Sequence, residues 1–158
     1  MPHFHSEQFV ARPVDEVFAF FSDASNLEAI TPRQLNFHIL TPGPIRLAAG
    51  ARIDYQLKLY GIPLKWATLI ESWDPPHQFV DVQLRGPYRI WRHTHRFMNE
   101  GVGTRIVDDV DYELPLGPIG RLVDVLWTRR EVAQIFGYRT EVIARQFSSN
   151  KQSGLLFR

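Results

Sequence analysis

"YRIWRHTHRF" (residues 88–97) is rich in aromatic and β-branched side chains, which are typical of a β-strand. A second run of this kind, "TRIVDDVDYEL" (104–114), follows after the turn sequence "NEGVG", whose two glycines permit a tight reversal. Together the two runs predict an antiparallel hairpin. Because side chains alternate between the two faces of a strand, we expect one face of the hairpin to be mainly apolar and the other charged.

The inner face of the first strand carries large or imidazole side chains, namely Trp91, His93, His95 and Phe97. We expect the strand pairing that sets Arg92 opposite Asp109 on the outer face, because opposed unlike charges stabilise a sheet. The same pairing sets His93 opposite Asp108 on the inner face. A shift by one residue would mix charge with apolar surface on both faces, which burial disfavours.

The sequence around this hairpin predicts further strands. Residues 33–114 contain six β-rich runs, separated by turn signals such as "TPGP", "YGIP", "DPPH" and "RGP". Residues 3–11 suggest one more strand at the start of the chain. The result is an antiparallel meander, of which only one face needs to be buried.

Three helices are predicted outside these strands. Pro13 suits the first turn of a helix, and Pro32 should end a second short helix. Residues 118–147 predict a long helix of roughly 45 Å. Its apolar stripe consists of Ile119, Leu122, Leu126, Ala133, Phe136, Ile143 and Phe147, with Arg129 and Thr140 as polar members. A helix laid across a curved sheet leaves room at the edges, where a ligand cavity is expected.

Composition excludes several classes of protein. The 158 residues include 18 Lys and Arg against 17 Asp and Glu, so the chain lacks the basic excess of nucleic-acid-binding proteins. It has no cysteine, which excludes disulfides and thiolate zinc sites. It has neither an apolar run of the ~20 residues that a transmembrane segment needs nor an apolar N-terminal signal segment. We therefore expect a cytoplasmic protein without nucleic-acid partners.

The length fits one domain, which we place at residues 1–147. The remaining stretch, "SSNKQSGLLFR" (148–158), is polar and then apolar, and we expect a flexible C-terminal tail, with a docking peptide as the alternative. The sequence makes no prediction of the oligomeric state.

The chain resembles the START-like, or SRPBCC, helix-grip superfamily, and within it the small bacterial ligand-binding proteins described as cyclase/dehydrase-like. The resemblance covers residues 4–147. It rests on "GARIDYQLKLYGIPLKW", "FVDVQLRGPYRIWRHTHRF" and "GTRIVDDVDYELPLGPIG". It implies an α+β fold in which a curved seven-stranded antiparallel sheet wraps around a long C-terminal helix, with two short helices after the first strand.

The resemblance and the residues together predict two functions. The first is binding of a small hydrophobic or amphipathic molecule, such as a lipid, a fatty acid or a polyketide-like aromatic, between sheet and helix. Its ligand-binding residues would be Trp66, Trp91, His95, Phe97, Tyr112 and Phe136. The alternative is a cyclase or dehydratase, a lyase in which His93 and Asp108 act as an acid–base pair. Binding is the primary prediction.

A metal site is the third possibility for the histidine pair. His93 and His95 share a strand face, and Asp108 could supply a third ligand. No third histidine or cysteine stands at a recognisable spacing, so neither a metal nor another cofactor is expected.

Overall fold

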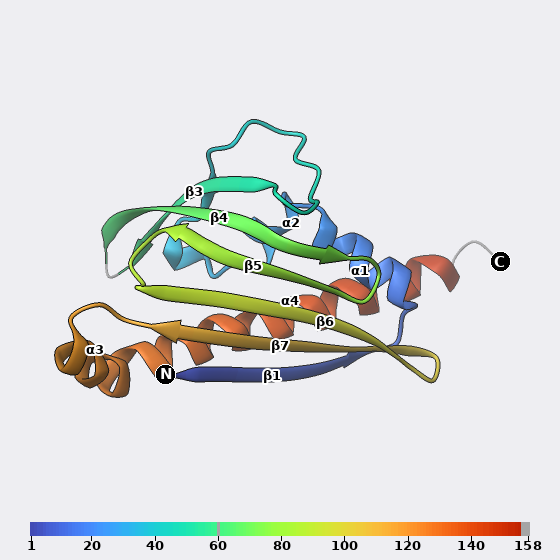
Figure 1. Ribbon diagram of the computed structural model, residues 1–158. Helices are drawn as coiled ribbons and strands as arrows, with labels where there is room; N and C mark the ends of the chain where they lie inside the picture. Colours follow the sequence, from blue (N-terminus) through green and yellow to red (C-terminus); the bar gives the residue numbers. More distant parts are fainter. Residues whose placement is uncertain (60, 156–158) are drawn as a thin grey trace.

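The computed structural model describes the backbone of residues 1–59 and 61–155 and the side chains of residues 1–59 and 61–148. Its centre is a seven-stranded antiparallel sheet with the strand order β1-β7-β6-β5-β4-β3-β2 (Figure 1). The strands are β1 (His3–Val10), β2 (His38–Ile39), β3 (Arg52–Leu59), β4 (Ile62–Asp74), β5 (Gln78–Arg85), β6 (Ile90–Glu100) and β7 (Gly103–Glu113). Strands β2 to β7 form the predicted meander, and β1 adds to its edge beside β7.

Helices cover one face of this sheet (Figure 1). They are α1 (Val14–Ser22), α2 (Asn26–Ala29), the 3₁₀ turn η1 (Arg33–Leu35), α3 (Gly117–Val123), the π-helical turn η2 (Asp124–Thr128) and α4 (Arg129–Leu155). The α+β class, the two short helices after the first strand and the long C-terminal helix are confirmed. None of the helices in the described part of the chain has the length and apolar character that a membrane span requires.

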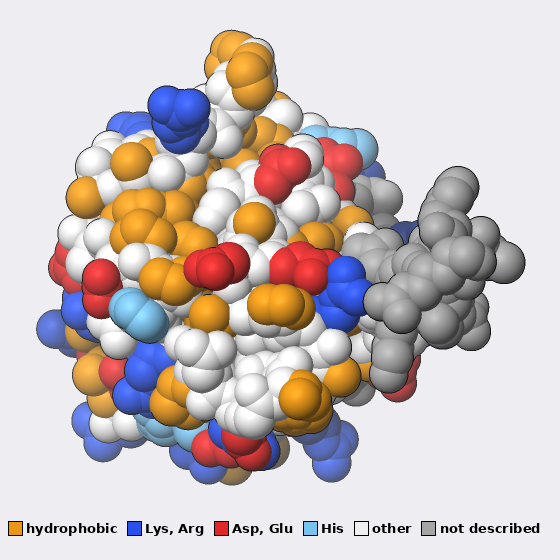
Figure 2. Space-filling model, turned by 90° about the vertical axis from the view of Figure 1, so that its right-hand side faces the viewer, with side chains coloured by type: hydrophobic (Ala, Val, Ile, Leu, Met, Phe, Trp, Pro, Cys, Tyr) orange, Lys and Arg blue, Asp and Glu red, His pale blue; other side chains and the backbone are white. Residues whose placement is uncertain are grey.

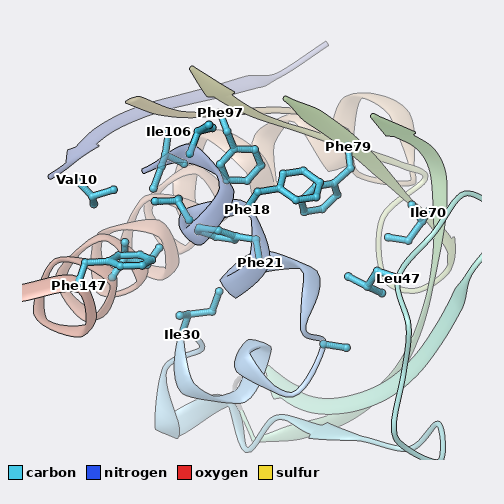
Figure 3. Packing of buried hydrophobic residues seen from close by; sticks show 14 of the residues in the cluster. Val10, Phe18, Phe21, Ile30, Leu47, Ile70, Phe79, Phe97, Ile106 and Phe147 are labelled. Atoms are coloured by element: carbon cyan, nitrogen blue, oxygen red, sulfur yellow. The ribbon is translucent and has the colours of Figure 1, made fainter. Parts of the chain in front are cut away.

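Helix α1 closes one end of the space between the sheet and α4. Its first turn follows Pro13, as predicted, and its buried face carries Phe18 and Phe21. The centroid of the Phe18 ring lies 5.3 Å from that of Phe97 and 6.0 Å from that of Phe79, in edge-to-face contacts (Figure 3). Aromatic pairs of this kind add stabilisation to the area that they bury. The core is therefore packed with side chains at this end of the molecule.

The pairing of β6 with β7 differs from the predicted one. Arg92 lies opposite Asp111 rather than Asp109, so the strands are offset by two residues from the prediction. The reason lies in the turn, where Glu100 pairs with Gly103 across a two-residue loop whose first residue, Gly101, has φ of 60°. Glycine adopts this backbone conformation without steric cost. An offset of two keeps every side chain on its predicted face.

The predicted stripe of the C-terminal helix is wrong in its first half. Ile119, Leu122 and Leu126 of this stripe are 63%, 59% and 48% exposed. The residues that face inward there are Gly120, Asp124 and Thr128. A π-helical turn has more residues than an α-helical turn. Residues four apart, such as Gly120, Asp124 and Thr128, therefore stay on one face of the helix across η2. Farther along, Val132 and Phe136 are buried while Ala133 is exposed.

The end of the chain was assigned to a tail from residue 148. Helix α4 extends through Leu155, so it crosses that boundary. Residues 156–158 lie outside the described residues, as do the side chains from residue 149 onward. The flexible tail and the docking peptide both remain predictions.

The surface carries both signs of charge. Figure 2 shows acidic and basic side chains interspersed over one face of the molecule, with apolar side chains between them. This distribution agrees with the net charge of +1.

Candidate functional site

A cavity of about 190 Å³ lies between the inner face of the sheet and α4. Its lining is mostly apolar, and its aromatic members come from α1 and α4, from strands β3, β4, β5 and β6, and from the segments between elements. Aromatic contacts join Tyr55, Trp66, Tyr88 and Trp91, with ring centroids 4.8–5.9 Å apart. Such a wall suits a flat apolar molecule.

Four polar side chains form one buried cluster on the cavity's sheet side. Two are imidazoles, His93 and His95, and two are carboxylates, Asp81 and Asp108. His95 Nε2 donates to Asp81 Oδ2 over 2.6 Å, and His93 Nε2 donates to Asp108 Oδ1 over 2.7 Å. His95 Nδ1 lies 3.2 Å from Asp108 Oδ1, at ion-pair distance but without hydrogen-bond alignment. The two imidazole centroids are 3.6 Å apart.

Strand register brings these four side chains together. Asp81 on β5 lies opposite His93 on β6, and His95 lies opposite Asp108 on β7. The hydrogen bonds run along the diagonals, so that each imidazole bonds the carboxylate that is paired with the other. The predicted contact between His93 and Asp108 therefore forms, although the predicted register was wrong.

Both carboxylates of the cluster are ionised. Burial works against the charged form of Asp108, but the Arg139 guanidinium, the hydrogen bond from His93 and the adjacent His95 imidazole hold its pKa well below the usual range. Burial also opposes ionisation of Asp81, and the hydrogen bond from His95 with the nearby charges lowers its pKa. Ionised carboxylates only accept hydrogen bonds, so the imidazole nitrogens are the donors.

The two imidazoles differ in their protonation. Burial and the neighbouring His95 lower the pKa of His93, although Asp108 and Asp81 act in the opposite direction. Burial opposes the charge on His95 as well, but the adjacent Asp108 carboxylate and the hydrogen bond to Asp81 outweigh it and raise the pKa. His93 is therefore neutral, with its N–H on Nε2 and its lone pair on Nδ1.

One cation of helix α4 also lines the cavity. The guanidinium of Arg139 lies over the rings of Phe21 and Phe136, 5.3 and 5.6 Å from their centroids. Its Nε and Nη2 are buried and have no hydrogen-bond partner in the described part of the chain. Buried guanidinium donors are normally paired, so these two N–H groups are available to a ligand.

The sequence-predicted residues divide into two groups. Those that line the cavity are Trp66, Trp91, His93, His95 and Phe136. Asp108 lies behind the histidines and does not line it. Phe97 and Tyr112 share the inner face but do not reach the cavity either: α1 covers Phe97, and the Tyr112 hydroxyl donates to Asp124 Oδ1 over 2.7 Å.

Sequence reasoning missed Asp81 and Arg139. A signal existed for each of them. Asp81 follows Phe79 by two residues and so shares its face of the strand, and Arg139 falls between Phe136 and Ile143 at helical spacing. An isolated charge at an inward position is costly, and in a folded protein it usually has a function or a partner.

A larger surface groove of about 1170 Å³ lies on the other side of α1, against residues 39–46. Phe18 and Trp73 form part of its lining. It contains none of the residues of the histidine–carboxylate cluster.

Several solved structures share this fold. Protein Ms6760 from Mycobacterium smegmatis has a TM-score of 0.70 and 17% identity over 94% of this chain and 92% of its own. TTHA0849 from Thermus thermophilus has a TM-score of 0.69 and 20% identity, with coverages of 90% and 97%. A START superfamily protein from M. smegmatis has a TM-score of 0.67 and 15% identity, with coverages of 91% and 97%. At such identities the likeness shows the fold alone.

Sequence comparison assigns the family. None of the curated proteins compared is similar enough in sequence to count as a match. The family described as "Polyketide cyclase / dehydrase and lipid transport" matches residues 10–145, which is most of the chain. The protein therefore belongs to the polyketide cyclase / dehydrase and lipid transport family, with the helix-grip fold of the START-like superfamily.

Proposed function

We propose that the protein binds a small amphipathic molecule whose apolar body lies against the aromatic wall and whose oxygen atoms meet Arg139. The observation that carries this proposal is the pair of buried, unpartnered donors Nε and Nη2 of Arg139 in a mostly apolar cavity. An unsatisfied buried donor costs about 1–3 kcal/mol. A carbonyl or carboxylate oxygen of a ligand would remove that cost.

The size of the cavity narrows the ligand class. Pockets for drug-sized ligands have volumes of about 300–1,000 Å³. The cavity here, at about 190 Å³, is smaller. We therefore favour a compact aromatic compound with a carbonyl or carboxylate group over a long-chain lipid. The stacked rings of Tyr55 and Trp66 offer a flat surface for such a compound.

The geometry gives less support to the cyclase or dehydratase alternative. That function requires the His93–Asp108 pair, which forms at 2.7 Å. However, Asp108 lies behind the imidazoles, so of the four residues of the cluster His93, His95 and Asp81 reach the cavity and Asp108 does not. A lyase would have to act on its substrate through these three side chains rather than through Asp108. The unpartnered donors of Arg139, by contrast, support binding.

Binding is tested with three naphthalenes that differ only in their oxygen atoms: 2-naphthoate, 2-acetylnaphthalene and 2-ethylnaphthalene. The two oxygenated compounds should bind more tightly than the hydrocarbon, as measured by quenching of tryptophan fluorescence. In the Arg139→Met variant they should lose at least about tenfold in affinity, because hydrogen bonds to a charged group contribute about 1.5–3 kcal/mol. Binding of 2-ethylnaphthalene should not change.

The matched control is Arg130→Met, an exposed position on the same helix. Leu122→Ser tests for binding at the exposed apolar surface of α3. Neither control should alter the affinities. Equal affinity of wild type for all three compounds, or an equal loss of all three in Arg139→Met, would contradict the proposal.

A further inference from the structure

We propose that Asp81, His93 and His95 form a binding site for a divalent transition-metal ion, such as Zn²⁺ or Fe²⁺, at the floor of the cavity. One ligand atom from each residue lies within 4.8 Å of the other two. Two imidazoles and one carboxylate are a ligand set that these ions accept while keeping further positions open. The inference goes beyond the proposed function and does not require the organic ligand.

The distances suit coordination with small side-chain movements. Asp81 Oδ2 is 2.6 Å from His95 Nε2 and 3.7 Å from His93 Nδ1. Metal–ligand bonds of about 2.0–2.2 Å place tetrahedral ligand atoms roughly 3.4 Å apart. The observed separations fall on either side of this value. A metal ion here would replace the proton that His95 Nε2 donates to Asp81.

Asp108 contacts the ring nitrogens of both histidines on the side away from the proposed metal ion. The ring nitrogens that face away from Asp81 are His93 Nε2 and His95 Nδ1, and both lie near Asp108 Oδ1, at 2.7 and 3.2 Å. A carboxylate behind a metal-bound imidazole fixes its tautomer and its orientation. A single aspartate is placed to do so for both histidines, and His95 Nδ1 would gain the aligned partner that it lacks.

Charge and access agree with a cation at this position. The carboxylates of Asp81, Asp108 and Glu131 line or adjoin the cavity, against the single guanidinium of Arg139. Coordination requires both imidazoles to be neutral, and in that state these groups leave two net negative charges, which a divalent ion neutralises. Asp81, His93 and His95 line the cavity whereas Asp108 does not. The open coordination positions would therefore face the cavity.

A second group, His3, His5 and Asp109, has similar ligand atoms on the outer face of β1 and β7. Its histidine side chains are 47% exposed, and Asp109 is also paired with Arg96. The second ring nitrogens of His3 and His5 also face carboxylates, those of Asp111 and Glu7, but these side chains are exposed and the group lines neither of the two cavities. This group supplies the control for the buried site.

The test uses untagged, metal-free protein titrated with Zn²⁺ by calorimetry and with Co²⁺ by visible absorption. Wild type should bind one Zn²⁺ per chain at the buried site and show a Co²⁺ d–d band. Asp81→Asn and His95→Gln should each weaken binding at that site at least about tenfold and abolish the band. The double variant His3→Gln/His5→Gln should keep both.

Folding of each variant is checked by circular dichroism without metal. Two variants of different chemistry, Asp81→Asn and His95→Gln, keep the test decisive if one of them fails to fold. Absence of Zn²⁺ binding in wild type, or its loss only in the His3/His5 variant, would overturn the inference. The naphthalene measurements are made in a chelating buffer, which removes metal ions. Their outcome therefore does not depend on the metal site, and each proposal can fail without the other.

Discussion

At the scale of single residues, a side chain on the inner face of the sheet does not necessarily line the cavity. Tyr112 shares that face with the cavity residues of β6, yet its hydroxyl is used elsewhere. It donates to Asp124, which also accepts from Arg129 Nε over 2.8 Å, and both Tyr112 and Asp124 are 2% exposed. This contact ties the end of the sheet to the π-helical turn, so Tyr112 has a structural role.

Replacing Tyr112 by Phe should lower the free energy of unfolding by about 1.5–3 kcal/mol, because a buried hydrogen bond to a charged group is lost. Urea denaturation measures this change. Affinity for 2-acetylnaphthalene should stay at the wild-type value, since the side chain does not line the cavity. Weaker binding with unchanged stability would instead make Tyr112 a ligand contact, as the sequence predicted.

At the scale of elements, β1 is an edge strand that is held to β7 by charged pairs as well as by its ladder. His3 bonds Asp111 and Asp109, and His5 bonds Asp109 and Glu7. The hydrogen bonds to Asp111 and Asp109 raise the pKa values of His3 and His5 above 6.5. Protonation of these histidines therefore favours the folded edge.

The sign of the resulting pH dependence follows from this direction. The stabilisation by His3 and His5 should be complete below the unfolded pKa of 6.5 and should be lost as pH rises through the higher folded values. The melting temperature of wild type minus that of His3→Gln/His5→Gln should therefore shrink from about pH 5.5 to about pH 8.5, a window that brackets the histidine pKa. Arg96 and Arg105, which pair with Asp109 and Glu7, are kept in both proteins.

This effect should be small, no more than roughly 2–4 °C, because exposed pairs are screened by solvent. Titration of the two imidazoles by NMR provides an independent measurement. Imidazole pKa values at or below the ordinary value of 6.5, or a melting difference that grows with pH, would contradict the prediction.

At the scale of the whole molecule, the sheet encloses two different interiors. One end is filled by α1, whose Phe18 contacts Trp73, Phe79 and Phe97. The other end contains the cavity, between the sheet and α4, and Phe21 is the residue of α1 that reaches it. Stability and binding are thus assigned to different ends of one fold.

Replacing Phe18 by Ala should therefore cost about 3–5 kcal/mol of stability, a large part of the roughly 5–15 kcal/mol typical of a domain. Phe9→Ala, at a position that is 45% exposed, should cost much less. Urea denaturation of both variants checks the comparison. Similar losses for the two would show that α1 does not act as the plug described here.

The sequence by itself determined the order of elements, the α+β class and the inner face of β6, because these depend on local periodicity and turn residues. The placement of Trp91, His93 and His95 on one face followed directly from alternation. The predicted contact between His93 and Asp108 also forms, although through a diagonal rather than through the expected register.

Only the tertiary structure decided the composition of the site. Asp81 reaches the histidines through the pairing of β5 with β6, and Arg139 reaches the cavity through the phase of α4 after the π-helical turn. Strand register depends on the loop that closes each hairpin, and helix phase depends on every turn before it. Neither the register nor the helix phase can be read from a local sequence pattern. For the register, a shift of two residues leaves the alternation of side chains along a strand unchanged.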